Sequence, residues 1–238
     1  IKSVTVLLFL KTSQAEGFMM NARLHQFMRM LVGGANPFAH SASQPDLQRC
    51  GIRKAAYIES TRQNIRLDLG CGDSRRPGFV GIDLDQGADI QWDIRWGIPF
   101  SDDRIAEIRS DHFFEHLELP LVVDTFRECR RVLVPGGSLD FTVPHIDPYI
   151  DAYLRRDWEF LRSRIYDVPP GQEHLYDTCF DRIVWLLHRA GDHKSLFDRD
   201  SILTKLRVAG FADITTREYD PARDTNWRYS SIYVVATK

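Results

Sequence analysis

Two glycines and a following acid carry the clearest chemical signal in this sequence. Residues 65–73 read Ile-Arg-Leu-Asp-Leu-Gly-Cys-Gly-Asp, in which apolar and polar residues alternate as in a half-buried strand. Gly70 and Gly72 would let backbone N–H groups approach a ligand, because a Cβ would block that approach and the turn can require positive φ. Asp83 lies in a second predicted strand over 79–85, which ends in an acid. A glycine turn, a short connection, a strand and an acid indicate a nucleoside site, with the acid on the ribose hydroxyls.

A second pattern points to different chemistry. Residues 112–116 read His-Phe-Phe-Glu-His, which matches the H-x-x-E-H signature of one class of zinc peptidases. On a helix, His112 and His116 would share a face and could bind zinc, with Glu115 as general base. Leu117 and Pro120 follow closely, so we interpret the segment as a short link between a strand and a helix. We therefore expect no metal site, and a zinc peptidase stays the minor alternative.

The composition indicates an ordinary globular protein. The chain has 238 residues, of which 43% are hydrophobic and 27% charged, enough for one domain with an insertion or a small cap. A net charge of −2 gives no basic bias toward nucleic acid, and we interpret three Arg-Arg pairs (75–76, 130–131 and 155–156) as solvated surface. The four cysteines lack metal-binding spacing and predict free thiols in a reducing, cytoplasmic compartment. The apolar run 4–10 is too short to span a membrane.

These candidate residues need a framework of strands to bring them together. Residues 1–63 are predicted as a helical extension, with helices over 20–31 and about 46–59, and residues 64–238 as the main domain. Strands are predicted at 65–69, 79–85, 89–92, 105–110, 138–143, 212–219 and 230–237. Helices are predicted at 119–133, ended by Pro135-Gly136-Gly137, and at 199–208. Residues 145–198 are predicted as an inserted helical cap.

The first two connections between strands are unusually short. A parallel crossover usually takes a dozen or more residues, mostly helix, but 72–79 has room for about one helical turn and 85–89 for none. One face of the sheet therefore lacks its usual helices around the first strands, and an uncovered apolar face would be a large exposed patch. We predict that the two N-terminal helices pack on that face.

Read together, residues 64–238 resemble class I S-adenosylmethionine-dependent methyltransferases. Leu67–Gly72 is similar to the first motif of that family and Gly81–Asp83 to the second. The other matching segments are Asp93-Ile94 ahead of Gly97–Phe100, Arg131–Gly137 before the fifth strand, and Ala209–Phe211 before the closing hairpin. The resemblance implies an α/β, Rossmann-like, doubly wound sheet of seven mainly parallel strands with an antiparallel last strand. The short crossovers and residues 110–117 resemble a compact bacterial subgroup that often accompanies polysaccharide or glycoside biosynthesis, which is an association by analogy only.

The resemblance also implies S-adenosylmethionine as cofactor and a role for each matching residue. Gly70 and Gly72 would let the backbone approach the methionine and ribose parts, and Asp68 would engage the amino end through a water or a backbone contact. Asp83 would accept both ribose hydroxyls, and Asp93 the adenine amino group. As alternatives, the glycines could form an ordinary tight turn, Asp83 could be a surface acid at the end of a strand, and Asp93 could be a turn former. The expected cofactor-binding residues are Asp68, Leu69, Gly70, Cys71, Gly72, Asp83, Leu84, Asp93, Ile94 and Asp111.

The implied reaction is in-line methyl transfer to a small acceptor, with a hydroxyl of a glycan, glycoside or related metabolite as the leading expectation. A hydroxyl acceptor benefits from a base with a pKa near neutral, so His112, His145 and His193 are the candidates, unless they are structural. The aromatic residues of the cap suit a sugar or an aromatic acceptor, or else form the cap's own core. A natural-product or protein acceptor, a non-catalytic S-adenosylmethionine-binding module and a homodimer stay open.

Overall fold

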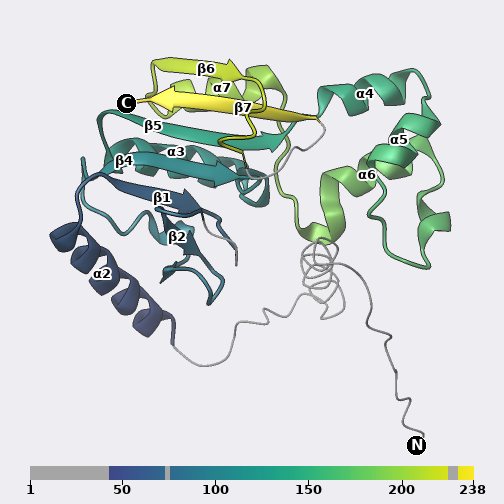
Figure 1. Ribbon diagram of the computed structural model, residues 1–238. Coiled ribbons are helices and arrows are strands. Elements are labelled where there is room, and N and C mark those ends of the chain that lie inside the picture. The colour runs from purple at the N-terminus through teal and green to yellow at the C-terminus, as the bar shows by residue number, and fades with distance from the viewer. Residues whose placement is uncertain (1–42, 73–75, 225–229) are drawn as a thin grey trace, which may run out of the picture. The chain divides into compact units, whose positions relative to one another are not determined.

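The computed structural model of the protein describes residues 43–72, 76–224 and 230–238 (Figure 1). The predicted helix over 20–31 and the apolar run 4–10 lie outside these residues. The predicted helix near 46–59 is α2 (Gln44–Thr61), which begins with Pro45 in its first turn. Along the described chain, no helix has both the length and the apolar character needed to cross a bilayer.

A seven-stranded sheet forms the centre of the described chain. Its order is β3-β2-β1-β4-β5-β7-β6, so the strands run outward in both directions from β1 and β4 as in a doubly wound fold. The first five strands pair in parallel, and β7 is antiparallel to both β5 and β6. The bounds are β1 (Ile65–Leu69), β2 (Val80–Asp83), β3 (Ile90–Gln91), β4 (Ile105–Asp111), β5 (Leu133–Pro144), β6 (Asp213–Arg217) and β7 (Ser231–Thr237). This confirms the predicted α/β fold with its antiparallel last strand.

The two shortened crossovers are also confirmed. The described residues between β1 and β2, and those between β2 and β3, contain no helix. Residues between β3 and β4 form only the 3-10 turn η1 (Ile94–Trp96). The first full crossover helix is α3 (Leu119–Val132), between β4 and β5, and it is followed later by α7 (Arg199–Val208).

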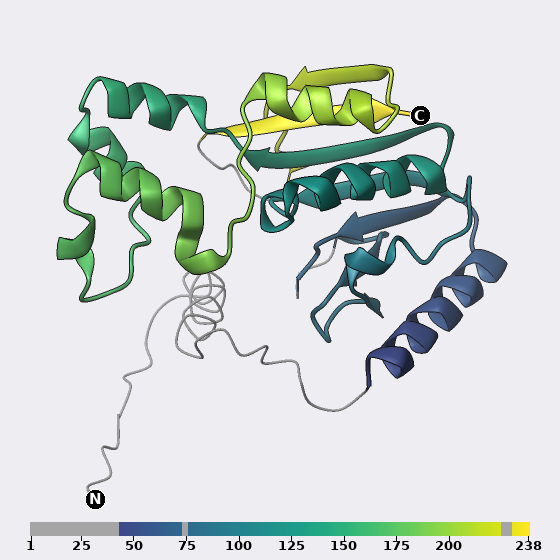
Figure 2. The ribbon, with the colours of Figure 1, turned by 180° about the vertical axis from the view of Figure 1, so that it is seen from behind.

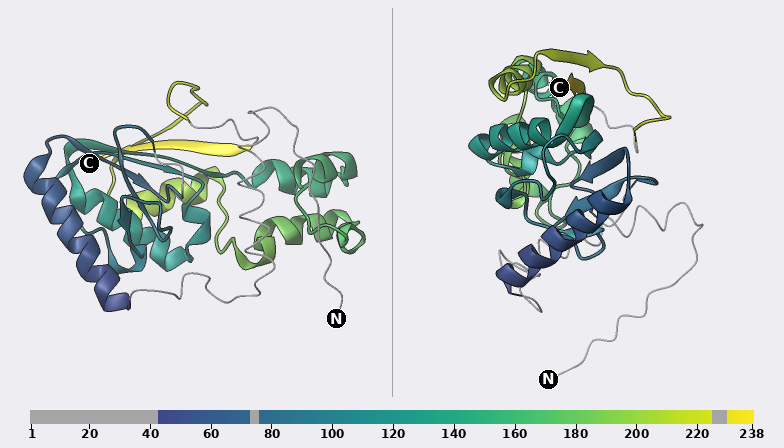
Figure 3. Two further views of the ribbon diagram at one scale, coloured as in Figure 1. Left: turned by 60° about the horizontal axis from the view of Figure 1, so that its bottom comes forward. Right: turned by 90° about the vertical axis from the view of Figure 1, so that its left-hand side faces the viewer.

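Helices α2, α3 and α7 cover one and the same face of the sheet, as Figures 2 and 3 show. In α3, the ring of Phe126 lies 5.4 Å from that of Phe141 on β5. In α2, Gly51 packs directly on the side chains of Trp92 and Ile90. Paired residues on neighbouring strands point to the same face of the sheet. Phe141 pairs with Ser110, Ser110 with Leu69, Leu69 with Ile82 and Ile82 with Ile90, so Phe141 and Ile90 lie on one face. The prediction that the second N-terminal helix covers the face lacking crossover helices is therefore wrong.

The opposite face is polar, which is the physical reason that it needs no apolar cover. Asp140 on β5 is buried there and its carboxylate forms ion pairs with Arg217 (2.7 Å) and Arg223 (2.9 Å). Arg109 on β4 pairs with Glu107 at 2.6 Å. These strands alternate apolar residues toward the helices and charged residues away from them, so the face without helices is not the apolar patch that the short crossovers suggested.

The segment Pro135-Gly136-Gly137 does not end the helix before β5. Helix α3 ends at Val132, and β5 begins at the next residue. Ile105 of β4 pairs with Leu133, and Glu107 pairs with Ser138, so residues 134–137 bulge out of the β4–β5 ladder. Gly136 takes a φ of +79° within this bulge, a conformation that favours glycine.

An insertion of short helices extends beyond the carboxyl end of β5 (Figure 1). It consists of α4 (Asp147–Leu154), α5 (Trp158–Arg164), η3 (Glu173–Tyr176), α6 (Cys179–His188) and η4 (Arg189–Gly191). Tyr149 and Trp185 are buried in its core, where Tyr149 contacts Phe160 and Trp185 contacts Tyr176. Tyr166, by contrast, is 70% exposed. The aromatic residues of the cap are therefore divided between its core and its surface.

Candidate cofactor site and its histidines

The glycine turn at the end of β1 has the backbone that the sequence suggested. Gly70 and Gly72 have φ values of +69° and +57°, in the left-handed region where a Cβ is unfavourable. A Cβ on Gly70 would lie 2.4 Å from the Phe113 ring, so the turn packs directly on the loop after β4. A Cβ on Gly72 would meet no atom within 4 Å. Gly70 thus serves packing, and Gly72 leaves open space beside its backbone.

Asp83 is tied to this turn. Its Oδ2 accepts a hydrogen bond of 2.9 Å from Gly72 N, and its Oδ1 accepts one of 2.9 Å from Asp85 N. The acid at the end of β2 and the glycine turn at the end of β1 therefore form one unit at the carboxyl edge of neighbouring strands. From the described residues each carboxylate oxygen accepts one hydrogen bond, which leaves it a second lone pair for a further donor.

Asp68 is buried on β1, and its partner is Arg76, which was predicted to lie on the surface. Arg76 donates to it twice, from Nη1 to Oδ1 at 2.5 Å and from its backbone N to Oδ2 at 3.0 Å. Burial raises the pKa of Asp68, although the charge of Arg76 opposes this shift. The interpretation of Arg76 as solvated surface is wrong, because a buried carboxylate requires a partner and Arg76 supplies it.

The other predicted cofactor residues lie around this edge in different settings. Leu69 is buried, and its carbonyl accepts a 3.0 Å hydrogen bond from Ser110 Oγ. Cys71 has its thiol pKa raised to about 12 by burial and by the neighbouring Asp83, so it stays neutral. Leu84, next to Asp83, is 53% exposed, which is unusual for an apolar side chain beside a buried strand.

Asp93 caps the 3-10 turn η1. Its Oδ1 accepts from Arg95 N at 3.0 Å, and both of its oxygens contact the Arg95 guanidinium. Ile94, the next residue, packs on the hydrophobic core. The carboxylate of Asp93 therefore already has partners, in agreement with the turn-forming alternative that the sequence left open.

Asp111 ends β4, and His112 follows it next to the glycine turn. Asp111 Oδ1 accepts a 2.5 Å hydrogen bond from Thr142 on β5. His112 has a φ of +51°, a strained value for a residue with a side chain. Its Nδ1 lies 3.0 Å from Glu115 Oε1 and its Nε2 lies 3.0 Å from Ser231 Oγ. A carboxylate at Nδ1 holds that nitrogen protonated, so Nε2 carries the lone pair and can act as a base.

The arrangement of residues 112–116 excludes the helical geometry of a zinc peptidase. Only Phe114–His116 is helical, as the single 3-10 turn η2. His112 bonds to Glu115 itself, and His116 turns to the residue Asp192, whose carbonyl lies 3.0 Å from its Nδ1. His112 and His116 thus do not form the pair of ligands that the pattern suggested.

His193 and His145 occupy two separate places. His193 is buried against His116, with ring centres 5.3 Å apart, and its Nδ1 lies 3.2 Å from Leu186 O. Burial lowers the pKa of His193 to about 4, so the imidazole is neutral at pH 7. His145 follows β5, pairs with Asp147 at 3.0 Å and lines a cavity of about 370 Å³ beside β6 and β7.

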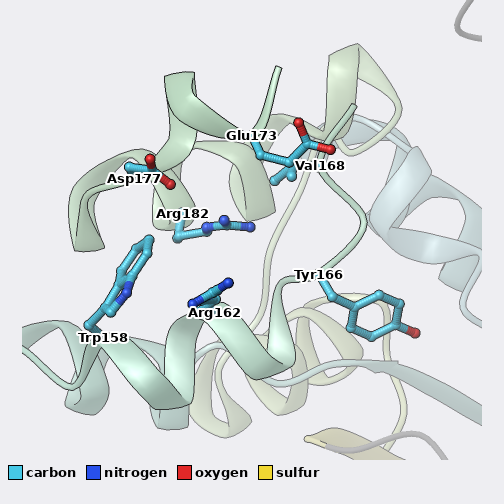
Figure 4. Close-up of a pocket in the computed structure, with 7 residues that line it drawn as sticks. All are labelled: Trp158, Arg162, Tyr166, Val168, Glu173, Asp177 and Arg182. Atoms are coloured by element: carbon cyan, nitrogen blue, oxygen red, sulfur yellow. The ribbon is translucent and has the colours of Figure 1, made fainter. Parts of the chain in front are cut away.

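A larger cavity, of about 540 Å³, lies within the helical insertion (Figure 4). Arg162 of α5 and Arg182 of α6 point toward its centre, as Figure 4 shows. Its lining consists of Trp158, Arg162, Tyr166, Val168, Glu173, Asp177 and Arg182. An aromatic ring together with several hydrogen-bonding side chains is the combination that binds polar, ring-shaped ligands.

Four residues that contact the predicted site residues were not predicted from the sequence. Phe113 supports the glycine turn, Arg76 neutralises Asp68, Thr142 holds Asp111, and Ser231 contacts His112. Phe113 stands within the H-x-x-E-H pattern of residues 112–116, but its contact with Gly70 arises only when β1 and β4 pair. Ser231 lies 119 residues from His112, and no local pattern links them.

Comparison with known proteins finds likeness only at the level of structure. No protein-family model matches this chain, and no curated protein matches it. The chain is similar to an S-adenosylmethionine-dependent methyltransferase from Mesorhizobium loti, with 18% identity over 81% of this chain and 98% of that one and a TM-score of 0.43. It is also similar to SAM-dependent methyltransferases from Methanosarcina mazei (15% identity, 76% and 96% covered, TM-score 0.45) and Archaeoglobus fulgidus (12%, 83% and 95%, TM-score 0.41). Likeness at this distance carries no conclusion about the reaction.

Proposed function

We propose that this protein transfers a methyl group from S-adenosylmethionine to a small acceptor. The observation that carries the proposal is the hydrogen bond from Gly72 N to Asp83 Oδ2, which joins the glycine turn of β1 to the acid that ends β2. In doubly wound sheets, nucleoside ligands bind across the carboxyl ends of the strands next to the point where the strand order reverses. Here that point lies between β1 and β4.

The residues at this edge fit such a cofactor. The space beside Gly72 is open, and each oxygen of Asp83 accepts only one hydrogen bond from the described residues, so a lone pair on each could accept a ribose hydroxyl. The exposed side chain of Leu84 offers an apolar surface for the adenine ring. When bound, S-adenosylmethionine supplies a methyl group on a sulfonium that is its own leaving group. The remaining work of the protein is to hold the acceptor in line and to remove its proton.

We assign the role of base to His112 first. Glu115 holds the proton on Nδ1, and Ser231 Oγ donates to Nε2 at 3.0 Å. Ser231 can accept the proton of an acceptor hydroxyl while passing its own to Nε2, so His112 becomes positively charged as the acceptor oxygen is methylated. The carboxylate of Glu115 stabilises that charge. His145 is the second candidate, because it is partly exposed and lines the smaller cavity.

We propose a hydroxyl of a glycan, glycoside or related metabolite as the acceptor. The support is the cavity of the insertion, which combines Trp158 with charged side chains that can bond to hydroxyl groups. The four cysteines are free thiols, which supports the further proposal that the protein works in the reducing cytoplasm.

Calorimetry with S-adenosylmethionine tests the cofactor assignment. We expect Asp83→Ala to weaken binding by roughly 10- to 100-fold, because it removes hydrogen bonds to a charged group. Asp83→Asn should have a smaller effect, since it keeps one acceptor for Gly72 N. The control is Asp213→Ala, at the exposed start of β6 on the opposite edge of the sheet. Unchanged affinity in Asp83→Ala would refute the ribose assignment.

Turnover distinguishes an enzyme from a non-catalytic binding module. A panel of glycosides is incubated with labelled S-adenosylmethionine, and methylated product is measured by mass spectrometry. We expect His112→Ala to lower kcat by about 100-fold or more and Ser231→Ala by less, with unchanged cofactor affinity in both. Full turnover in both His112→Ala and His145→Ala would exclude these histidines as bases. Binding without product from any acceptor class would favour the non-catalytic module.

A further inference from the structure

Outside the cofactor edge, two histidines and a glutamate meet where the helical insertion returns to the sheet. Glu115 and His116 belong to η2, directly after β4, and His193 follows η4 at the end of the insertion. One potential ligand atom from each of the three lies within 4.8 Å of the other two. Glu115 and His193 are buried, whereas the side chain of His116 is 34% exposed.

One potential ligand atom of each side chain already has a partner. His116 Nδ1 lies 3.0 Å from Asp192 O and 3.3 Å from Asp192 Oδ1, and His193 Nδ1 lies 3.2 Å from Leu186 O. Glu115 Oε1 is bonded to His112. These bonds leave Nε2 of both imidazoles and Oε2 of the glutamate as the atoms able to bind something else.

The lack of a partner for the buried Glu115 Oε2 points to a ligand. Its side chain is 1% exposed, and this oxygen has no hydrogen-bond partner among the described residues. A buried carboxylate oxygen without a partner costs free energy that folded proteins normally avoid. The two imidazoles cannot both donate a hydrogen bond to Glu115 Oε2. Their Nδ1 atoms lie beside carbonyl oxygens and carry the proton there, so Nε2 of a neutral ring has no proton to donate.

We propose that Glu115, His116 and His193 bind a divalent transition metal ion, with Zn²⁺ as the best fit. Two imidazole nitrogens and one carboxylate oxygen are a known donor set for zinc, whereas Mg²⁺ and Ca²⁺ take oxygen ligands. The contacts behind the ligands agree with this, since metal-bound histidines commonly donate their second N–H to a carboxylate or a backbone carbonyl. Asp192 and Leu186 occupy those places. The exposed edge of His116 gives the ion a path from solvent and leaves a position for water.

The site differs from the one that the H-x-x-E-H pattern implies. His112 is not a ligand here but holds the glutamate from behind, and His193, far away in sequence, replaces it. The ion would join η2 to the segment after the insertion. That junction already has two backbone hydrogen bonds, from Lys194 N and Ser195 N to Glu115 O at 2.8 and 3.0 Å.

Equilibrium dialysis of the chelator-treated full chain against ZnCl₂, followed by elemental analysis, tests the proposal. We expect one zinc per chain in the wild type and in the control His174→Ala, which removes an exposed histidine of η3. Glu115→Gln and His193→Ala should each lower the affinity by about 100-fold or more, since even residues behind the ligands contribute about 10- to 100-fold. Zinc should raise the Tm of the wild type but not that of these two variants.

Zinc content far below one per chain in the wild type, or wild-type affinity in both variants, would overturn the proposal. Cobalt(II) substitution of the wild-type protein makes the test independent of how the variants fold. Ligand-field absorption without a thiolate charge-transfer band supports a nitrogen and oxygen site. A strong thiolate band would assign the ion to the cysteines and refute the proposal, as would displacement of zinc by equimolar Mg²⁺.

Discussion

Replacement of Gly70 and Gly72 by alanine, one at a time, separates two demands that a glycine turn places on a fold. Both residues have positive φ, so each alanine imposes a similar backbone cost. Only Gly70 has a neighbour in the way, because its Cβ would lie 2.4 Å from Phe113 Cδ2 and 2.6 Å from Cγ. The Cβ of Gly72→Ala would enter open space.

The expected magnitudes follow from these contacts. A left-handed conformation costs a non-glycine residue about 1–2 kcal/mol, which is the whole effect expected on the stability of Gly72→Ala. Gly70→Ala must also displace the Phe113 ring, and overpacking of this kind costs a further ~1–3 kcal/mol. We therefore expect Gly70→Ala to lower the free energy of unfolding by about 2–5 kcal/mol. Binding of S-adenosylmethionine should fall in Gly72→Ala, because the added methyl group would enter the space proposed for the cofactor, and in Gly70→Ala, because displacing the Phe113 ring disturbs the same turn.

Urea unfolding followed by circular dichroism measures the stability difference, and calorimetry measures cofactor affinity. Adding Gly70→Ala to Phe113→Ala should lower the free energy of unfolding by less than adding Gly70→Ala to the wild type, since the ring that clashes is gone. Equal stability of Gly70→Ala and Gly72→Ala would refute the packing argument. So would a Gly70→Ala effect that is the same with and without the Phe113 ring.

Three further changes test other parts of the reasoning. Asp68→Asn should cost about 3–5 kcal/mol in urea unfolding, because it leaves the largely buried Arg76 without its counter-charge; a loss below 1 kcal/mol would contradict this. The hydrogen bond from Arg131 lowers the pKa of Glu128 below its ordinary 4.5. The ionised Glu128 therefore stabilises the folded state above pH 4.5, and this stabilisation is lost as the pH falls through the lower folded-state pKa. Glu128→Gln should therefore cost ~1–2 kcal/mol at pH 7 and progressively less below pH 4.5, and a constant difference would be the contrary result. Leu84→Ser should weaken S-adenosylmethionine binding about fivefold in calorimetry while changing stability by less than about 0.5 kcal/mol, and an unchanged affinity would remove Leu84 from the site.

Local sequence was enough to predict the succession of strands along the chain and the glycine turn, whereas their doubly wound arrangement was implied by the family resemblance. Helix α7 matches its predicted bounds, and β1 does too, because apolar periodicity and the residues that end each element are properties of neighbours in the chain. The shortness of the first crossovers was also visible, since it is a matter of counting residues. The link between Gly72 and Asp83 could be anticipated because parallel neighbours bring their carboxyl ends together.

Contacts across the sheet were decided only by the tertiary structure. The side of the sheet covered by α2 depends on the register of several strands, and a shift by one residue would exchange the two faces. The partnership of Asp68 with Arg76 depends on how the loop after β1 folds back. Glu115 and His193 come together through the path of a whole helical insertion. No spacing in the chain encodes such meetings, because they arise from packing and charge pairing between segments that are distant in sequence.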